Sequence, residues 1–147
     1  MMRQFAVFMF CFIFFGCNFN ANVTYENEKA EKENAESIAG MFYLYISRNE
    51  FDSVLDLFSG SFYEVSSKSD LKEFLIDKRK KLGDFKDYTL KNWKTRRVEG
   101  TNAVTEYLLT YQVKYSKNQV IEKVTLIKEK DKIKICGYDV SKPVKTN

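Results

Sequence analysis

Histidine is absent from this chain of 147 residues, and proline, cysteine and glycine are scarce, with one, three and six residues. Without histidine the chain can build neither a Ser-His-Asp or Cys-His catalytic site nor a histidine-based metal site. The six glycines are scattered, so no Gly-x-Gly cluster can hold a phosphate, and there is no Cys-x-x-Cys pair. We therefore expect no metal ion and no cofactor.

Strong charge of one sign is also missing. The formal net charge is +4, which is mild for a chain with 24 basic and 20 acidic residues. Proteins that bind nucleic acid usually cluster lysine and arginine much more strongly, so we expect no nucleic-acid partner. A hydrophobic content of 44% and a charged content of 30% are typical of one small globular domain.

The first 17 residues have the pattern of an export signal. Arg3 gives a basic start, residues 5–15 are all apolar, and the small residue Gly16 precedes Cys17. The apolar run is too short for a membrane-spanning helix, which needs about 20 residues. Ordinary secretion, with a chance cysteine at position 17, is the alternative interpretation.

The Gly16-Cys17 pair after the apolar run resembles the lipobox of bacterial lipoproteins, with Phe14 where leucine is usual. The resemblance implies that residues 1–16 are a lipoprotein signal peptide and that Cys17 becomes the lipid-carrying first residue. Its acyl chains would anchor the protein to a membrane of the cell envelope, with the domain facing the periplasm or the exterior. Cys136 would then be the single thiol, and its strand-like surroundings predict burial.

Helical periodicity begins after a polar segment of residues 17–34, which we expect to be a tether. A stripe of apolar residues at helical spacing predicts a helix over about 28–47: Ala35, Ile38, Ala39, Phe42 and Ile46. A second helix is expected at about 50–58. A third should follow the serine-rich residues 66–69 and end at Gly83.

From Tyr88 the period of the pattern changes to two, which is typical of half-buried strands. We predict strands over 88–98, 103–115, 120–130 and 132–140, with a bulge near Gly137 and a polar tail at 141–147. Helices followed by strands predict an α+β fold, in which three N-terminal helices pack on one face of an antiparallel sheet of about four strands.

Three stretches, at 79–83, 122–126 and 133–138, resemble the nuclear transport factor 2-like fold, also called the cystatin-like cone. The resemblance covers about residues 35–140 and implies a curved sheet that wraps a long helix and two shorter ones. It also implies a pocket between the helices and the sheet, and it leaves open a homodimer formed through the sheet. Enzymes of that superfamily use an acidic base with tyrosine donors in an apolar cavity.

Glu122 is the acidic residue of greatest interest, because it shares strand parity with Val124 and Leu126 and should point inward. A buried carboxylate needs a partner, and we expect Arg79 to form that ion pair across the helix–sheet interface. The alternative is that both charges are solvated. The candidate pocket-lining residues are Tyr107, Tyr111 and Tyr138.

Residues 70–98 carry ten basic and five acidic residues, which makes this stretch locally positive. A basic patch here would attract an anionic partner, such as phospholipid headgroups or an acidic protein surface. A solvated charged surface explains the same residues without a partner. The candidate basic patch comprises Lys78, Lys81, Lys94, Arg96 and Arg97.

These features favour a lipid-anchored, non-enzymatic binding domain that contacts a small apolar ligand or a partner protein. The alternatives are a small isomerase, dehydratase or hydrolase that uses Glu122 or Asp139 with tyrosine, and a purely structural envelope component. An enclosed pocket with an inward carboxylate and converging tyrosines would favour the enzyme. A pocket filled by its own side chains, beside an exposed apolar sheet face, would favour protein interaction.

Overall fold

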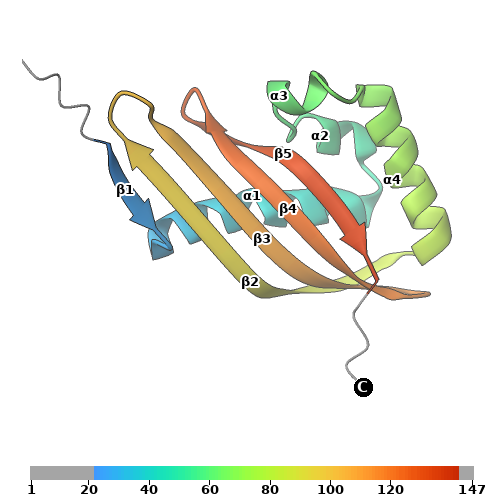
Figure 1. Ribbon diagram of the computed structural model, residues 1–147. Coiled ribbons are helices and arrows are strands. Elements are labelled where there is room, and N and C mark those ends of the chain that lie inside the picture. The colour runs from blue at the N-terminus through green and yellow to red at the C-terminus, as the bar shows by residue number, and fades with distance from the viewer. Residues whose placement is uncertain (1–21, 143–147) are drawn as a thin grey trace, which may run out of the picture.

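The computed structural model describes residues 22–142, which form four helices and five strands (Figure 1). Four strands follow the helices and one precedes them. In chain order the elements are β1 (Val23–Glu26), α1 (Lys29–Arg48), α2 (Phe51–Leu55), α3 (Gly60–Tyr63), α4 (Lys68–Leu82), β2 (Phe85–Glu99), β3 (Val104–Tyr115), β4 (Gln119–Glu129) and β5 (Lys132–Ser141).

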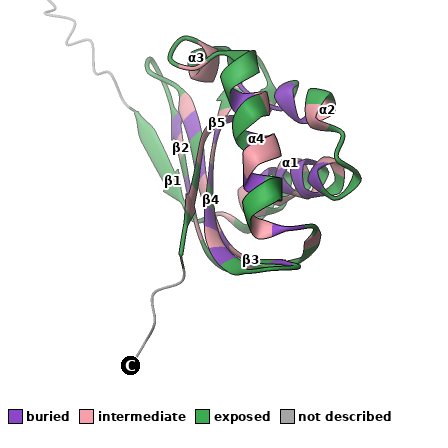
Figure 2. Cartoon of the chain, turned by 90° about the vertical axis from the view of Figure 1, so that its right-hand side faces the viewer, coloured by how far each residue is buried: buried purple, intermediate pink, exposed green. Residues whose placement is uncertain are grey.

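The five strands form one curved antiparallel sheet, in which the spatial order β1-β2-β3-β4-β5 equals the chain order. All four helices cover one face of the sheet, and the opposite face, here called the outer face, is open to solvent (Figure 2). The expected α+β architecture, with helices packed on one side of an antiparallel sheet, is confirmed.

Helix α1 lies against the middle of the sheet and presents a continuous apolar stripe to it. Four of the five residues predicted by the helical spacing are buried, Ile38 is only partly buried, and Tyr43 joins the buried set: Ala35, Ala39, Phe42, Tyr43 and Ile46. The helix ends where Asn49 adopts the left-handed conformation, with φ of 57°. Burial of this stripe against the sheet, rather than intrinsic helix propensity, is the main source of stability for a helix in a folded protein.

Helix α4 has a defined start and stop. Ser67 and Asp70 form a reciprocal capping box at its N-terminus. Gly83 follows the last turn with φ of 88° and leads directly into β2. A side chain at this position would collide with Ser116 Oγ, so glycine is required by both the backbone conformation and the close approach of the β3–β4 turn.

The inner face of the sheet follows the period-two pattern that the sequence predicts. Six alternate residues of β3 are buried on this face: Thr105, Tyr107, Leu109, Tyr111, Val113 and Tyr115. In β5 the register shifts at Cys136, because Gly137 faces Thr125 while Ile135 faces Leu126. The bulge expected near Gly137 is therefore confirmed, and Cys136 is the extra residue, partly exposed rather than buried as expected.

Three expectations about the elements need correction. The expected tether of residues 17–34 is shorter, since Val23–Glu26 pairs with β2 and α1 starts at Lys29. The sheet accordingly has five strands rather than four. The second helix, expected at about 50–58, ends at Leu55, and the short α3, capped by the Ser59 hydroxyl, makes the number of helices four rather than three.

Candidate functional site

A buried polar cluster lies between α4, α1 and the sheet. Glu122 reaches it from β4 because it shares parity with the buried Val124 and Leu126, and it is completely shielded from solvent. Lys78 reaches it from α4, where it follows the buried Leu71 and Leu75 at helical spacing. The lysine side chain is 5% exposed and the glutamate 0%, so both charges are removed from water.

Three tyrosines complete the cluster. Tyr43 Oη donates to Glu122 Oε2 at 3.0 Å, and Tyr115 Oη donates to Glu122 Oε1 at 2.6 Å. The Lys78 ammonium donates to Glu122 Oε1 at 3.2 Å, to Tyr115 Oη at 2.8 Å and to Tyr138 Oη at 2.5 Å. Every buried side-chain nitrogen and oxygen of residues 22–142 has a hydrogen-bond partner, so the cluster is fully satisfied.

The electrostatics of the cluster follow from its burial. Desolvation lowers the pKa of Lys78, and the opposing attraction of Glu122 raises it. Desolvation, followed by the nearby Glu122 charge, raises the pKa values of Tyr43, Tyr115 and Tyr138. The tyrosines therefore remain neutral hydrogen-bond donors at physiological pH.

A carboxylate with neutral tyrosine donors is the set of groups that proton-transfer enzymes use, but here it has no room for a substrate. The hollow beside Lys78 has a volume of about 10 Å³, which is room for about one water molecule. Lys78 and the aromatic rings fill the space in which a ligand would lie. In this conformation the cluster links α4 to the sheet through the hydrogen bonds of Lys78.

The expected ion pair between Arg79 and Glu122 is not formed. Arg79 is about half exposed, and its Nε and Nη2 donate to Asp84 Oδ1 at 3.2 and 3.0 Å. The neighbouring residue, Lys78, is the partner of Glu122 instead. One step along a helix rotates a side chain by about 100°, which separates the inward Lys78 from the outward Arg79. The seven-residue spacing from Leu71 to Lys78 could have revealed this.

The three candidate pocket tyrosines do not share a site. Tyr107 donates to Glu31 of α1 at 2.9 Å, and Tyr111 packs edge-on against Tyr43. Only Tyr138 joins the Glu122 cluster, and Asp139 is exposed on β5. Tyr43 and Tyr115 were missed, although Tyr115 has the same strand parity as Tyr107 and Tyr111.

The candidate basic patch does not form one surface. Lys78 is buried, Lys81 is exposed at the end of α4, and Lys94 and Arg96 lie on the outer face of the sheet. Arg97 points toward the helices, where its guanidinium pairs with Glu28 at 3.0 Å and with Glu99 at 2.7 Å. The local excess of positive charge in the sequence is therefore divided among the interior and two faces.

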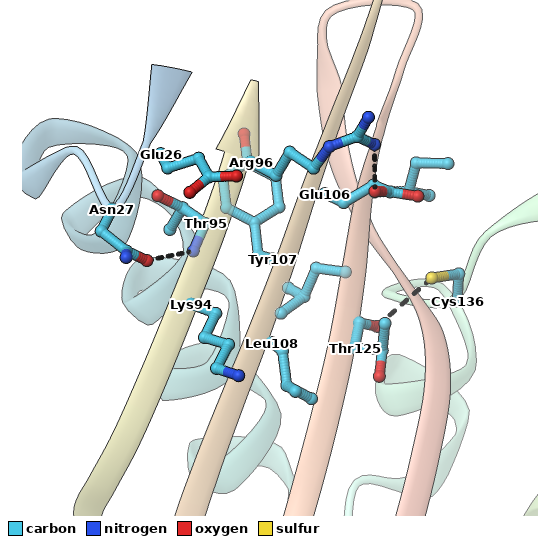
Figure 3. A pocket seen from close by; sticks show the side chains of 12 residues that line it. Glu26, Asn27, Lys94, Thr95, Arg96, Glu106, Tyr107, Leu108, Thr125 and Cys136 are labelled. Atoms are coloured by element: carbon cyan, nitrogen blue, oxygen red, sulfur yellow. Dashed lines mark hydrogen bonds and ion pairs between the residues drawn. The ribbon is translucent and has the colours of Figure 1, made fainter. Parts of the chain in front are cut away.

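A hollow of about 630 Å³ lies on the outer face of the sheet (Figure 3). Its floor comprises half-buried side chains from three strands, Leu108, Thr125, Ile127 and Cys136. Charged groups lie on its rim, where Arg96 pairs with Glu106 at 3.3 Å and Lys94 extends from β2. The Cys136 thiol contacts the Thr125 carbonyl oxygen at 3.6 Å, and partial burial raises the pKa of the thiol.

Comparison with known proteins adds no assignment. No family model, no curated protein and no solved structure matches the chain. Cys17 and the expected signal peptide of residues 1–16 lie outside the described residues. Among residues 22–142 no helix is both long enough and apolar enough to cross a membrane, and no group of histidine, cysteine and acidic residues could hold a metal ion.

Proposed function

We propose that this chain is a bacterial lipoprotein whose domain is a non-catalytic binding module at the cell envelope, with a cone of the nuclear transport factor 2-like type. One observation carries the binding assignment: the interior is filled by Lys78 and aromatic rings, whereas the outer face has a hollow of about 630 Å³. A hollow of that size lies within the range of ligand-binding sites. Its apolar floor and charged rim suit an apolar side chain or short segment of a partner protein.

The lipid anchor rests on the basic start, the apolar run of residues 5–15 and the Gly16-Cys17 pair. Replacing Cys17 by alanine removes the acceptor of the lipid, so we expect the protein to move from the membrane fraction to soluble fractions. Cell fractionation and mass spectrometry of the mature N-terminus measure this. Continued membrane partition of the Cys17→Ala protein, or native material that begins at Met1 without acyl mass, contradicts the anchor.

The outer-face assignment can be tested by photocrosslinking in cells. A photoreactive amino acid at Ile127 on the floor of the hollow should give one discrete crosslinked product. The same group at Leu44, which is 44% exposed on α1 at the opposite side of the sheet, is the control. A product of twice the protein's own mass identifies a second copy as the partner. Identical products at both positions, or none at Ile127, contradict the proposal.

A further inference from the structure

The Lys78 ammonium occupies a site that fits a primary ammonium group. Its three N–H donors are directed to three acceptors, Tyr115 Oη, Glu122 Oε1 and Tyr138 Oη. An ammonium has three donors, so none is left unpaired. The negative charge is supplied by Glu122, whose second oxygen is held by Tyr43.

Aromatic rings surround the same nitrogen. The Lys78 nitrogen lies 5.0 Å from the ring centre of Tyr138, 5.1 Å from that of Tyr115 and 5.8 Å from that of Phe42. Rings at these distances attract a cation through their negative faces, and the attraction is stronger when water is excluded. A carboxylate together with aromatic rings is the composition of binding sites for organic ammonium ions.

The residues that hold the ammonium belong to other elements than the residue that supplies it. Phe42 and Tyr43 come from α1, and Tyr115, Glu122 and Tyr138 come from three neighbouring strands. Lys78 alone comes from α4, whose backbone lies closest to α2 at the edge of the helical layer. The receptor for the cation is therefore complete without α4.

We propose that the buried centre of the fold is a binding site for a primary alkylammonium ion, which Lys78 closes by acting as its internal ligand. Helix α4 then serves as a lid that the Lys78 ammonium fastens to the sheet. This proposal does not depend on the lipid anchor or on the outer-face hollow.

The test uses n-propylammonium, which has the same three carbons and nitrogen as the lysine side chain beyond its Cβ. In the full chain purified in mild detergent, Lys78→Ala leaves a space of that shape beside Glu122. We expect the melting temperature of Lys78→Ala to fall by roughly 10–20 °C, and millimolar n-propylammonium to restore at least half of the loss in a saturable way. Thermal unfolding followed by circular dichroism measures both effects.

Three comparisons make the rescue specific. n-Propanol, which has no charge, should not restore Lys78→Ala. Lys78→Met fills the space without a cation, so n-propylammonium should not stabilise it. Adding Glu122→Gln to Lys78→Ala removes the negative charge and should abolish the rescue, whereas Lys81→Ala, exposed on the same helix, should respond as the unmodified chain does.

Equal stabilisation of all the variants by the amine, or equal rescue by n-propanol, would overturn the proposal. Should Lys78→Ala be unfolded in buffer, the readout becomes its refolding on addition of n-propylammonium. A chain that stays unfolded in the amine, while Lys78→Met folds, overturns the proposal as well.

Discussion

The carboxylate of Glu122 is fully buried, so it has lost its hydration. Hydrogen bonds from Lys78, Tyr43 and Tyr115 replace the lost water. A buried ion pair adds little net stability over a well-packed apolar pair, since both charges lose their hydration. Removing only one partner is costly, because the other charge then remains buried and unpaired. Replacing Lys78 should therefore destabilise the fold much more than replacing Arg79, although the two basic residues are adjacent.

We expect Lys78→Ala to lower the free energy of unfolding by about 3–5 kcal/mol, the usual cost of breaking a buried ion pair. Arg79→Ala removes only the exposed pair with Asp84 and should cost less than about 1 kcal/mol. Urea unfolding of the two variants measures the difference. The double variant Lys78→Met with Glu122→Leu should lose less than the sum of its single changes, because no charge is left unpaired. Equal losses for Lys78→Ala and Arg79→Ala contradict the assignment.

At this scale the sequence predicted that Glu122 points inward but assigned it the wrong partner. Strand parity has only two outcomes, so Val124 and Leu126 decide the direction of Glu122. Successive residues of a helix point in directions about 100° apart. Because residues 78–81 are all basic, their side-chain types do not show which of them faces the interior. Only the distance from Leu71 and Leu75 distinguishes Lys78.

At the scale of elements, the sequence predicted those with long periodic patterns and missed those without. Helices α1 and α4 and strand β3 each repeat their buried residues over several turns or pairs, and the structure confirms them. Strand β1 has four residues, all exposed, and exists because it pairs with the distant β2. Pairing between segments so far apart leaves no periodic signal in either of them.

The junction between α4 and β2 gives a prediction at this scale. Gly83→Ala should lower the free energy of unfolding by about 1–3 kcal/mol, because alanine at φ of 88° is strained and its Cβ meets Ser116. Gly60→Ala is the matched control, since it lies in α3 with nothing within 4 Å of an added Cβ. It should be neutral or stabilising by up to about 1 kcal/mol. Thermal unfolding compares the two, and a Gly83→Ala protein as stable as the unmodified chain contradicts the prediction.

At the scale of the whole molecule, the buried tyrosines make the fold sensitive to alkali. Burial raises the pKa values of five tyrosines on the inner side of the sheet: Tyr43, Tyr107, Tyr111, Tyr115 and Tyr138. Their stabilisation is complete below the unfolded value near pH 10 and is lost as the pH rises above it, because only the unfolded chain then releases the protons. The lowered pKa of Lys78 acts in the opposite direction, but it is a single group.

We therefore expect cooperative unfolding above about pH 10, with stability falling by about 1.4 kcal/mol per pH unit for each proton that only the unfolded chain has released. Circular dichroism and the absorbance of ionised tyrosine should change together during an alkaline titration. Ionisation of most tyrosines near pH 10 while the circular dichroism stays native would contradict the burial of these rings.

The order of helices and strands was sufficient to predict the α+β class, because short connections and an antiparallel sheet leave few arrangements. Whether the interior is open could not be predicted. That depends on whether Lys78, Phe42 and three tyrosines fill a common space. These residues lie far apart in the sequence, and a single sequence does not show which distant side chains pack against one another. The outer-face hollow was unpredictable for the same reason, since residues of all five strands line it.

The early start of β1 sets a limit on where the molecule can work. Val23 is six residues beyond Cys17, and six residues span at most about 20 Å when fully extended. With the proposed acyl chains on Cys17, the segment that joins the lipid to the first strand is shorter than the long strands of the sheet. A partner that reaches the floor between Leu108 and Ile127 must therefore also approach the bilayer to within a few nanometres.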